Sequence, residues 1–236
     1  MRSQARNKQN PIGPAPDARR HNERGGDRVD LKQIYEYTVN GNAAKVKELT
    51  QQALDEGVPP GEIVTKYLIP AMGEVGDRFE RNEFYVPELL IAARAMQGAL
   101  ALIKPLLSES DIQSAGKVAI GTVKGDLHDI GKNLVAMMLQ GAGFEIVDLG
   151  VDVAPDKFVE AVKNSGAQVV ALSALLTTTM PAMKTTIEAL KAAGLRDKVK
   201  VIIGGAPVTQ RYADEIGADG YAPDANSAVR KTKELL

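Results

Sequence analysis

The chain has 236 residues, of which 44% are hydrophobic and 25% are charged, and its formal net charge is -1. This length and composition allow one large or two small soluble domains with real cores. Aromatic residues make up only 4% of the chain and tryptophan is absent, so an aromatic surface that stacks on nucleic-acid bases or sugars is not expected. The absence of cysteine excludes disulfides, thiolate zinc sites and thiol nucleophiles.

The N-terminal segment, residues 1–28, predicts a disordered basic tail, because it has almost no large apolar residue. Its seven basic and three acidic residues fit an arm that binds nucleic acid or membrane, but they fit a solvated tail better. No apolar run approaches the roughly 20 residues that span a bilayer, and the apolar core of a signal peptide is missing. We therefore expect a cytoplasmic protein with neither nucleic acid nor membrane as a partner.

Four helices are predicted between Leu31 and about Leu107, because apolar residues recur there every three or four positions. Turn residues break the pattern at Asn40-Gly41, between Gly57 and Gly61, and around Asn82. Short connections of this kind favour an antiparallel bundle. The apolar positions that define the helices are Ile34, Tyr35 and Val39, then Val46 and Leu49, then Ile63, Tyr67, Leu68, Met72, Val75 and Phe79, and finally Leu89, Leu90, Ala93, Met96, Leu100 and Ile103.

The pattern changes after residues 108–116, a polar stretch that predicts a linker. Runs rich in valine and isoleucine then alternate with helical stretches, which is typical of a parallel sheet covered on both faces. The expected strands are Val118 to Val123, Phe144 to Leu149, Val169 to Ser173, Val199 to Ile203 and Gly220 to Ala222. We therefore predict a four-helix bundle at residues 29–107, followed at residues 117–236 by a doubly wound, flavodoxin-like or Rossmann-like α/β domain with five parallel strands.

Three predicted strands are followed by loops suited to a ligand, which in doubly wound sheets binds beyond the carboxyl ends of the strands. The loop after the first strand holds His128, the one histidine outside the predicted tail. Hydroxyl residues cluster between Ser173 and Thr179, after the third strand. Gly204 and Gly205 follow the fourth, where the missing side chains would let a bulky ligand lie against the backbone.

His128 has two interpretations. A lone histidine is often a hydrogen-bonded structural residue. Asp126 lies two residues earlier, however, and could bond one ring nitrogen, which makes the other a better ligand; Thr179 could bond Asp126 in turn. One histidine is enough as an axial metal ligand when a macrocycle supplies the other donors, as in heme and corrinoid sites. These residues therefore favour a large planar metal cofactor.

At these residues the sequence resembles the cobalamin-binding domains of methionine synthase and, more closely, the corrinoid proteins of methylamine and methanol methyltransferase systems. The matching residues are Asp126, His128 and Gly131 for the family motif Asp-x-His-x-x-Gly, Ser173 and Leu175 for Ser-x-Leu, and Gly204 and Gly205 for Gly-Gly. The resemblance extends upstream to Leu31, since Gly76-Asp77-Arg78-Phe79 and Tyr85-Val86-Pro87-Glu88 stand where the family's helical cap has its own pattern.

The resemblance implies a cobalamin whose cobalt is bound by His128 in place of the cofactor's own benzimidazole, an arrangement called base-off, His-on. Asp126 would hold the other ring nitrogen and Thr179 would extend this relay, although methionine synthase has serine there. The other cobalamin contacts that it implies are Gly125, Leu127, Asp129 and Gly131 in the histidine loop, Ser173, Leu175 and Thr177 beside the benzimidazole, Gly204 and Gly205 along the nucleotide tail, and Phe79, Val86 and Leu89 of the cap over the upper face.

The function implied by the resemblance is methyl transfer. Co(I) would take a methyl group from a donor held by a substrate-specific methyltransferase, and methyl-Co(III) would pass it to an acceptor held by a second methyltransferase. A reductive activase would be a further partner. The chain would act as a carrier subunit that is not catalytic alone. Proton uptake by the unit of His128 and Asp126 would favour four-coordinate Co(I), because a protonated imidazole cannot bind a metal.

Two alternatives stay open at this point. A similar second domain occurs in adenosylcobalamin mutases and in regulators that sense light or cobalamin, but no barrel or helix-turn-helix is evident in this chain. A cofactor-free receiver domain also has five strands with aspartates after the first, as Asp126 and Asp129 are here. A receiver has a further acidic residue after its third strand, however, where this chain has Ser173.

Overall fold

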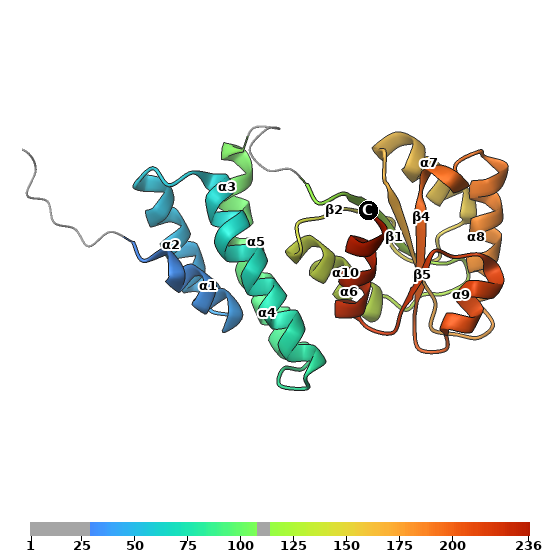
Figure 1. The fold of residues 1–236 in the computed structure, drawn as a ribbon, viewed down its shortest axis with the longest axis horizontal. Helices are drawn as coiled ribbons and strands as arrows, with labels where there is room; N and C mark the ends of the chain where they lie inside the picture. Colours follow the sequence, from blue (N-terminus) through green and yellow to red (C-terminus); the bar gives the residue numbers. More distant parts are fainter. Residues whose placement is uncertain (1–28, 108–113) are drawn as a thin grey trace, which may run out of the picture.

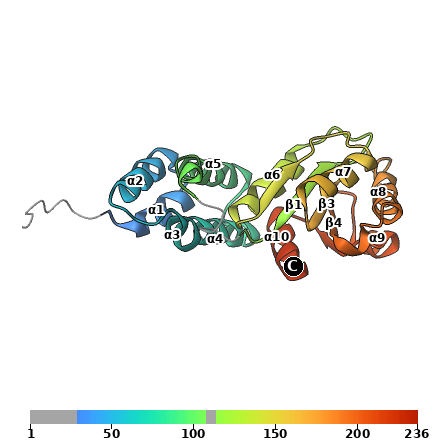
Figure 2. The ribbon, with the colours of Figure 1, turned by 90° about the horizontal axis from the view of Figure 1, so that it is seen from above.

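The computed structural model describes residues 29–107 and 114–236, so the predicted tail and most of the predicted linker lie outside the described residues. The first part is helical and the second alternates strands with helices (Figures 1 and 2). The helical part contains α1 (Leu31–Val39), α2 (Ala43–Asp55), α3 (Pro60–Ile63), the π-helix η1 (Val64–Leu68), α4 (Ile69–Glu80), α5 (Val86–Ile103) and the 3-10 helix η2 (Lys104–Leu106). The second part contains β1 (Lys117–Thr122), α6 (Ile130–Gly141), β2 (Glu145–Asp148), α7 (Pro155–Ser165), β3 (Val169–Ser173), α8 (Pro181–Ala192), the 3-10 helix η3 (Arg196–Lys198), β4 (Lys200–Gly204), α9 (Gln210–Ile216), β5 (Gly220–Ala222) and α10 (Ala225–Leu235).

The helical part forms four helical rods, because α3, η1 and α4 follow one another without a break. The π-helix between them has a backbone bond from Ile69 N–H to Val64 O. It ends one residue before Ile69-Pro70, and Pro70 has no N–H to donate and a ring that crowds the preceding turn. The wider turn accommodates this proline inside a long helix. Asn82, with φ +60, then reverses the chain into α5.

The expectation that no apolar stretch is long enough to span a bilayer is wrong for this part of the chain. The stretch Val86–Leu106, which joins α5 and η2, has 21 residues and a mean hydropathy of 1.4, so by length and composition it could cross a membrane. Its apolar character also has a packing explanation. Leu89, Ala92, Met96 and Ile103 are among the α5 side chains buried in the core, and a core helix meets the same criterion.

The sheet has five parallel strands in the order β2-β1-β3-β4-β5. Because β3 lies on the other side of β1 from β2, the chain changes direction across the sheet between β1 and β3. Ligands of doubly wound sheets bind at this switch point, beyond the carboxyl ends of the strands. The register places Thr122 of β1 beside Ser173 of β3, and Ser173 beside Gly204 of β4. The loops after these three strands therefore start side by side.

The two faces of the sheet carry separate cores because side chains alternate along a strand. In β3, Val169 and Ala171 pack with α6, α10 and the helical part, whereas Val170 and Leu172 pack with α7, α8 and α9. Both sets are fully or almost fully buried. This two-sided burial explains the continuous apolar runs in the sequence.

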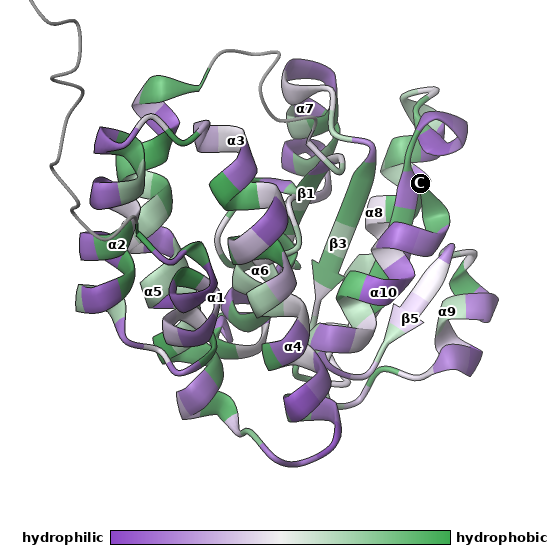
Figure 3. Cartoon of the chain, turned by 60° about the vertical axis from the view of Figure 1, so that its left-hand side comes forward, coloured by the Kyte–Doolittle hydropathy of each residue, from purple (hydrophilic) through white to green (hydrophobic). Residues whose placement is uncertain are grey.

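The helical part packs against the α6 and α10 side of the α/β domain (Figures 1 and 2). Two glycines make the approach close. A Cβ on Gly141 of α6 would lie 2.9 Å from Met72 Cγ of α4, and a Cβ on Gly76 of α4 would lie 2.4 Å from Asn226 Oδ1 of α10. At the end of α4, Glu80 accepts a hydrogen bond of 3.1 Å from Asn226 Nδ2 and pairs with Arg230. The turn after α4 lies at the same end of the molecule as the carboxyl ends of the strands (Figure 3).

Candidate cofactor site at the switch point

The loop between β1 and α6, residues 123–129, presents the candidate ligand, and we call it the histidine loop. Asp126 is completely buried in it. Its Oδ1 accepts the His128 backbone N–H at 3.1 Å and lies 2.7 Å from His128 Nδ1. At the end of β1, the buried hydroxyl of Thr122 donates to the His128 carbonyl at 2.8 Å. The backbone and one ring nitrogen of His128 are therefore both fixed.

The second oxygen of Asp126 links the histidine loop to the loop after β3. Asp126 Oδ2 accepts the Leu175 N–H at 2.8 Å, the Leu176 N–H at 3.3 Å and the Thr179 hydroxyl at 2.7 Å. Burial acts to raise the pKa of Asp126, but the hydrogen bonds from Thr179, His128 and Leu175 outweigh it and hold this pKa well below its usual range. The structure thus brings His128, Asp126 and Thr179 into one connected row.

The imidazole of His128 is directed outward. Its side chain is 50% exposed although its carboxylate partner is fully buried. An ionised Asp126 requires an N–H at Nδ1, so the neutral ring carries its lone pair at Nε2. Among the described residues no hydrogen-bond partner is placed at Nε2. This nitrogen is therefore available as a metal ligand.

Large apolar side chains lie exposed around the imidazole. Leu127 is 71% exposed, Ile130 75%, Leu175 43% and Leu176 42%. Apolar side chains grouped at one site in this way mark a surface that a ligand or partner covers. Together with the outward Nε2, they fit a broad planar group that lies on the loop and is bound at its centre.

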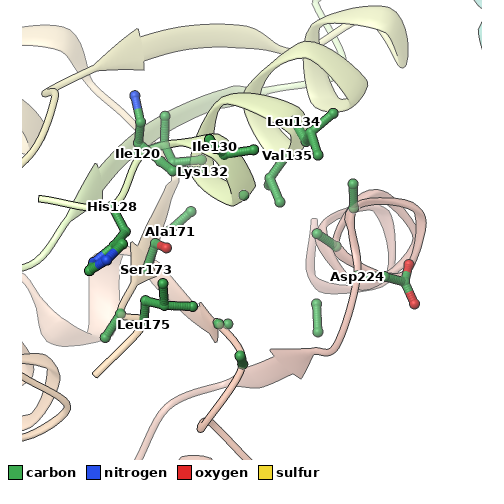
Figure 4. Close-up of a pocket in the computed structure, with 18 of the residues that line it drawn as sticks. Ile120, His128, Ile130, Lys132, Leu134, Val135, Ala171, Ser173, Leu175 and Asp224 are labelled. Carbon is green, nitrogen blue, oxygen red and sulfur yellow. The ribbon is translucent and has the colours of Figure 1, made fainter. Parts of the chain in front are cut away.

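A cavity of about 540 Å³ opens beside His128 and continues between the sheet and the helices α6 and α10 (Figure 4). Ser173 supplies a hydroxyl next to apolar walls. Phe79 and Leu89 of the helical part reach its lining. The other side chains that line it include Ile120, Leu134, Val135, Ala171, Ile202, Ala222 and Ala228. A slot of this size and polarity suits the nucleotide tail of a corrinoid, and the apolar surface above it suits the macrocycle.

Gly204 and Gly205 line this cavity, and the structure gives a further reason for glycine at these two positions. Gly205 has φ +127, and a Cβ there would lie 1.9 Å from the Ala174 carbonyl oxygen. A Cβ on Gly204 would lie 2.9 Å from the Ala222 carbonyl oxygen. The missing side chains therefore let neighbouring backbone segments approach, and the cavity is shaped by that approach.

The structure gathers most, though not all, of the residues suggested by the resemblance. The residues that line the cavity are Phe79, Leu89, Leu127, His128, Asp129, Gly131, Ser173, Leu175, Gly204 and Gly205. Gly125, Asp126 and Thr179 lie behind the imidazole and outside this lining. Val86 and Thr177 are exposed and do not line the cavity.

Sequence analysis missed several residues of the site. Thr122 orients His128 through its hydroxyl. In the sequence it lies at the end of an apolar strand, and only its position just before the histidine loop indicates a role. Leu134 and Val135 line the cavity, yet their spacing in α6 is that of any helix packed on a core. Lys132 is buried beside them, and a buried lysine has no signature in a single sequence.

Comparisons with known proteins find cobalamin-binding families and corrinoid proteins. Two family models, each described as a B12 binding domain, match residues 30–104 and 116–230. The dimethylamine corrinoid protein of Methanosarcina barkeri is 46% identical over 207 residues, which cover 87% of this chain and 97% of that protein. The trimethylamine corrinoid protein of the same organism is 49% identical over 192 residues, which cover 80% of this chain and 88% of that protein.

Solved structures show the same fold. A cobalamin-binding protein from Desulfitobacterium hafniense DCB-2 superposes with a TM-score of 0.72 at 32% identity, covering 88% of this chain and 99% of that one. A chain of the methanol:cobalamin methyltransferase complex from Methanosarcina barkeri gives 0.78 at 29% identity, covering 87% of this chain and 78% of that one. The predicted helical cap, five-stranded domain and cobalamin cofactor are thereby confirmed, and the receiver alternative is dropped. The chain belongs to the family of corrinoid proteins of methylamine methyltransferase systems, with a B12-binding cap and a B12-binding α/β domain.

Proposed function

We propose that this chain carries a methyl group derived from a methylamine, on a corrinoid whose cobalt is bound by His128. As a methylamine-type corrinoid protein it is a methyl carrier between methyltransferases. One observation supports His128 as the cobalt ligand. Its Nδ1 is held 2.7 Å from the buried carboxylate of Asp126, while its Nε2 is directed outward. When bound, the corrinoid supplies a cobalt centre that accepts a methyl group and releases it.

The residues of the chain hold, orient and shield that centre. Asp126 keeps the proton on Nδ1 and so fixes the tautomer in which Nε2 binds metal. Thr179 and the Leu175 N–H fix Asp126 in turn. Nε2 has a single lone pair, so it could hold either a proton or the cobalt, and protonation of His128 would compete with its role as ligand. Phe79 and Leu89 of the cap line the cavity and add apolar surface there, which would help to shield a bound group from water.

The relatives support an assignment of the methyl donor and of the partners. Relatives over 80% or more of this chain are corrinoid proteins for dimethylamine and trimethylamine. The similar methanol chain comes from a complex with a methyltransferase. We assign a substrate-specific methylamine methyltransferase as donor, a second methyltransferase as acceptor and a reductive activase as partners of this chain. We place it in the cytoplasm, where reducing conditions suit low-valent cobalt.

Anaerobic reconstitution with hydroxocobalamin tests the assignment of the ligand. We expect the wild-type protein to bind one equivalent and to show a base-off, His-on visible spectrum. His128→Ala removes the ligand and gives a base-off spectrum without histidine, whereas Asp126→Asn keeps the ring but weakens its coordination. His21→Ala serves as the matched control, since His21 is the other histidine of the chain. Identical spectra for the wild type and His128→Ala would refute the proposal.

Methyl transfer from the donor is measured separately. The loaded protein is first reduced to the Co(I) state with an added chemical reductant such as titanium(III) citrate. It is then mixed with a methylamine methyltransferase and monomethylamine, dimethylamine or trimethylamine, and formation of methylcobalamin is followed by its visible spectrum. We expect turnover with a methylamine and none with methanol and a methanol-specific methyltransferase. Methylation with methanol alone would overturn the assignment of the donor and leave that of the ligand intact.

A further inference from the structure

A short segment outside the cavity holds both ends of the histidine loop. It runs from Asp148, the last residue of β2, to Asp152 in the loop before α7, and we call it the β2–α7 brace. Within it, the Gly150 N–H donates to Asp148 Oδ1 at 2.9 Å, and Gly150 O accepts the Thr122 N–H at 3.0 Å. The brace is therefore tied to the end of β1, where the histidine loop begins.

Asp152 holds the start of the histidine loop. Its Oδ1 accepts the Gly125 N–H at 2.8 Å, its Oδ2 accepts from Lys124 Nζ at 3.0 Å, and its own N–H donates to the Asp126 carbonyl at 2.9 Å. Asp152 adopts φ +53, a left-handed conformation that most side chains avoid but that aspartate and asparagine tolerate. These contacts fix the backbone on both sides of the peptide that joins Gly125 to Asp126.

Asp148 holds the far end through Lys132 in the first turn of α6. The Lys132 side chain is 3% exposed, and its Nζ lies 2.6 Å from both carboxylate oxygens of Asp148. A buried ammonium requires such a partner, because an uncompensated charge in the interior is costly. The Lys132 stem forms part of the cavity wall next to Ile130 (Figure 4). The ion pair therefore ties the helix start after His128 to the end of β2.

We propose that Lys132, Asp148 and Asp152 are positioning residues that set where the His128 ring stands over the cavity. Neither acid touches the imidazole, and each acts through the backbone that carries it. Metal ligation depends on the ligand position within about 0.5 Å. Loosening either end would thus lower the share of cobalt that is bound by His128 while the cavity still accepts the nucleotide tail. This inference rests on the proposed function, because it concerns the same cofactor.

The test compares four variants loaded with cobalamin. Lys132→Met removes the ammonium but keeps the apolar stem, and Asp152→Ala removes the acceptor for the Gly125 N–H. Asp152→Asn is the rescue variant, since an amide keeps an acceptor oxygen and tolerates φ +53. Lys157→Met removes the ammonium of an exposed ion pair of α7 and is the matched control.

The readout is the share of cobalamin in the His-on form, from the visible spectrum and from the nitrogen splitting in the EPR spectrum of the Co(II) state. We expect the His-on to His-off ratio to fall about tenfold in Lys132→Met and Asp152→Ala, the size of losing one hydrogen bond. Asp152→Asn and Lys157→Met should retain the wild-type ratio. The affinity for cobalamin should change much less than the ratio.

The outcomes separate this inference from the proposed function. A wild-type protein without a His-on spectrum would defeat the proposed function itself. A His-on wild type with unchanged ratios in Lys132→Met and Asp152→Ala would defeat the brace alone. If Lys132→Met fails to fold, Asp152→Ala decides, because Asp152 is exposed and its loss leaves no buried charge unpaired.

Discussion

Among single residues, Asp126 has two roles. It is completely buried with a lowered pKa, so it supports His128 and also stabilises the folded protein. A carboxylate in this position cannot be replaced by an amide without loss. Its two oxygens accept from Thr179, His128 and Leu175, whereas asparagine offers one oxygen and points an NH₂ group at N–H donors. The charge and its donors stabilise each other in the absence of cofactor.

Asp126→Asn should therefore destabilise the cofactor-free protein by about 2 to 3 kcal/mol at pH 7, the range for hydrogen bonds to a charged group. The folded pKa of Asp126 lies below the unfolded value of about 3.9. Its contribution is thus fully present above about pH 5 and decreases progressively as the pH falls from about 4 toward the lower folded pKa. Urea unfolding from pH 7 to pH 3 measures this, with the exposed Asp197→Asn as control. A difference from the wild type that does not shrink in acid would contradict the assignment.

At the scale of the elements, the loop after β4 packs closely against the backbone of the loop after β3. Gly205 has a conformation closed to other residues, and its position leaves no space toward the Ala174 carbonyl. Gly73, on the exposed side of α4, has nothing within 4 Å of an added Cβ. The two glycines therefore differ in the reason for which a side chain is missing.

Gly205→Ala should lower the free energy of unfolding by more than about 3 kcal/mol, because the loop after β3 has to move away from the sheet. It should also abolish cobalamin binding, since Ser173 and Leu175 border the moved segment. Gly73→Ala should instead raise the stability by up to about 1 kcal/mol through its helix propensity. Thermal unfolding followed by circular dichroism distinguishes the two. Wild-type stability in Gly205→Ala would show that the loop has room that the structure denies.

The sequence predicted the elements well where their pattern is local. The apolar run of β3 and the turn at Asn40-Gly41 are visible in a window of a few residues. The pairing of Asp126 with His128 is also local, since two residues separate them. Contacts between residues that are distant in the sequence could not be predicted. Lys132 and Asp148 are 16 residues apart, and their sequence pattern does not distinguish a buried ion pair from two solvated charges.

The roles of the glycine pair and of Val86 could not be settled from the sequence for a related reason. A glycine shows that a side chain is missing but not what occupies its place. Val86 and Leu89 share the apolar pattern of α5, yet only Leu89 lies at the cavity. The face that α5 turns toward the site depends on how α4 and α6 pack, which a single helical period does not encode.

At the scale of the whole molecule, the cap and the α/β domain approach closely at glycines, and polar side chains lie at one edge of this contact. Gly76 leaves room for Asn226 and Met138, and Glu80 closes the edge through Asn226 and Arg230. Side chains near the cavity from both parts belong to one continuous buried cluster. Added bulk at this contact must therefore either deform the cluster or move the cap.

Gly76→Leu should displace the cap from α10. We expect a larger radius of gyration by small-angle X-ray scattering and a loss of about 1 to 3 kcal/mol in stability, as overpacked cores show. Gly73→Leu, three residues earlier on the exposed side of the same helix, should leave the radius unchanged. A radius that stays constant in Gly76→Leu would mean that Asn226 and Met138 yield instead.

The cluster shared by the cap and the α/β domain sets a thermodynamic condition on access to the cavity. Any separation of the two parts exposes apolar surface to water, at about 2.5 kcal/mol for each 100 Å². Without a bound partner, an open form would therefore be populated rarely. A methyltransferase that needs the open form has to bind it more tightly than the closed form by at least that free energy. The free energy that such a methyltransferase gains by binding the cap would then determine how often the cavity is open to it.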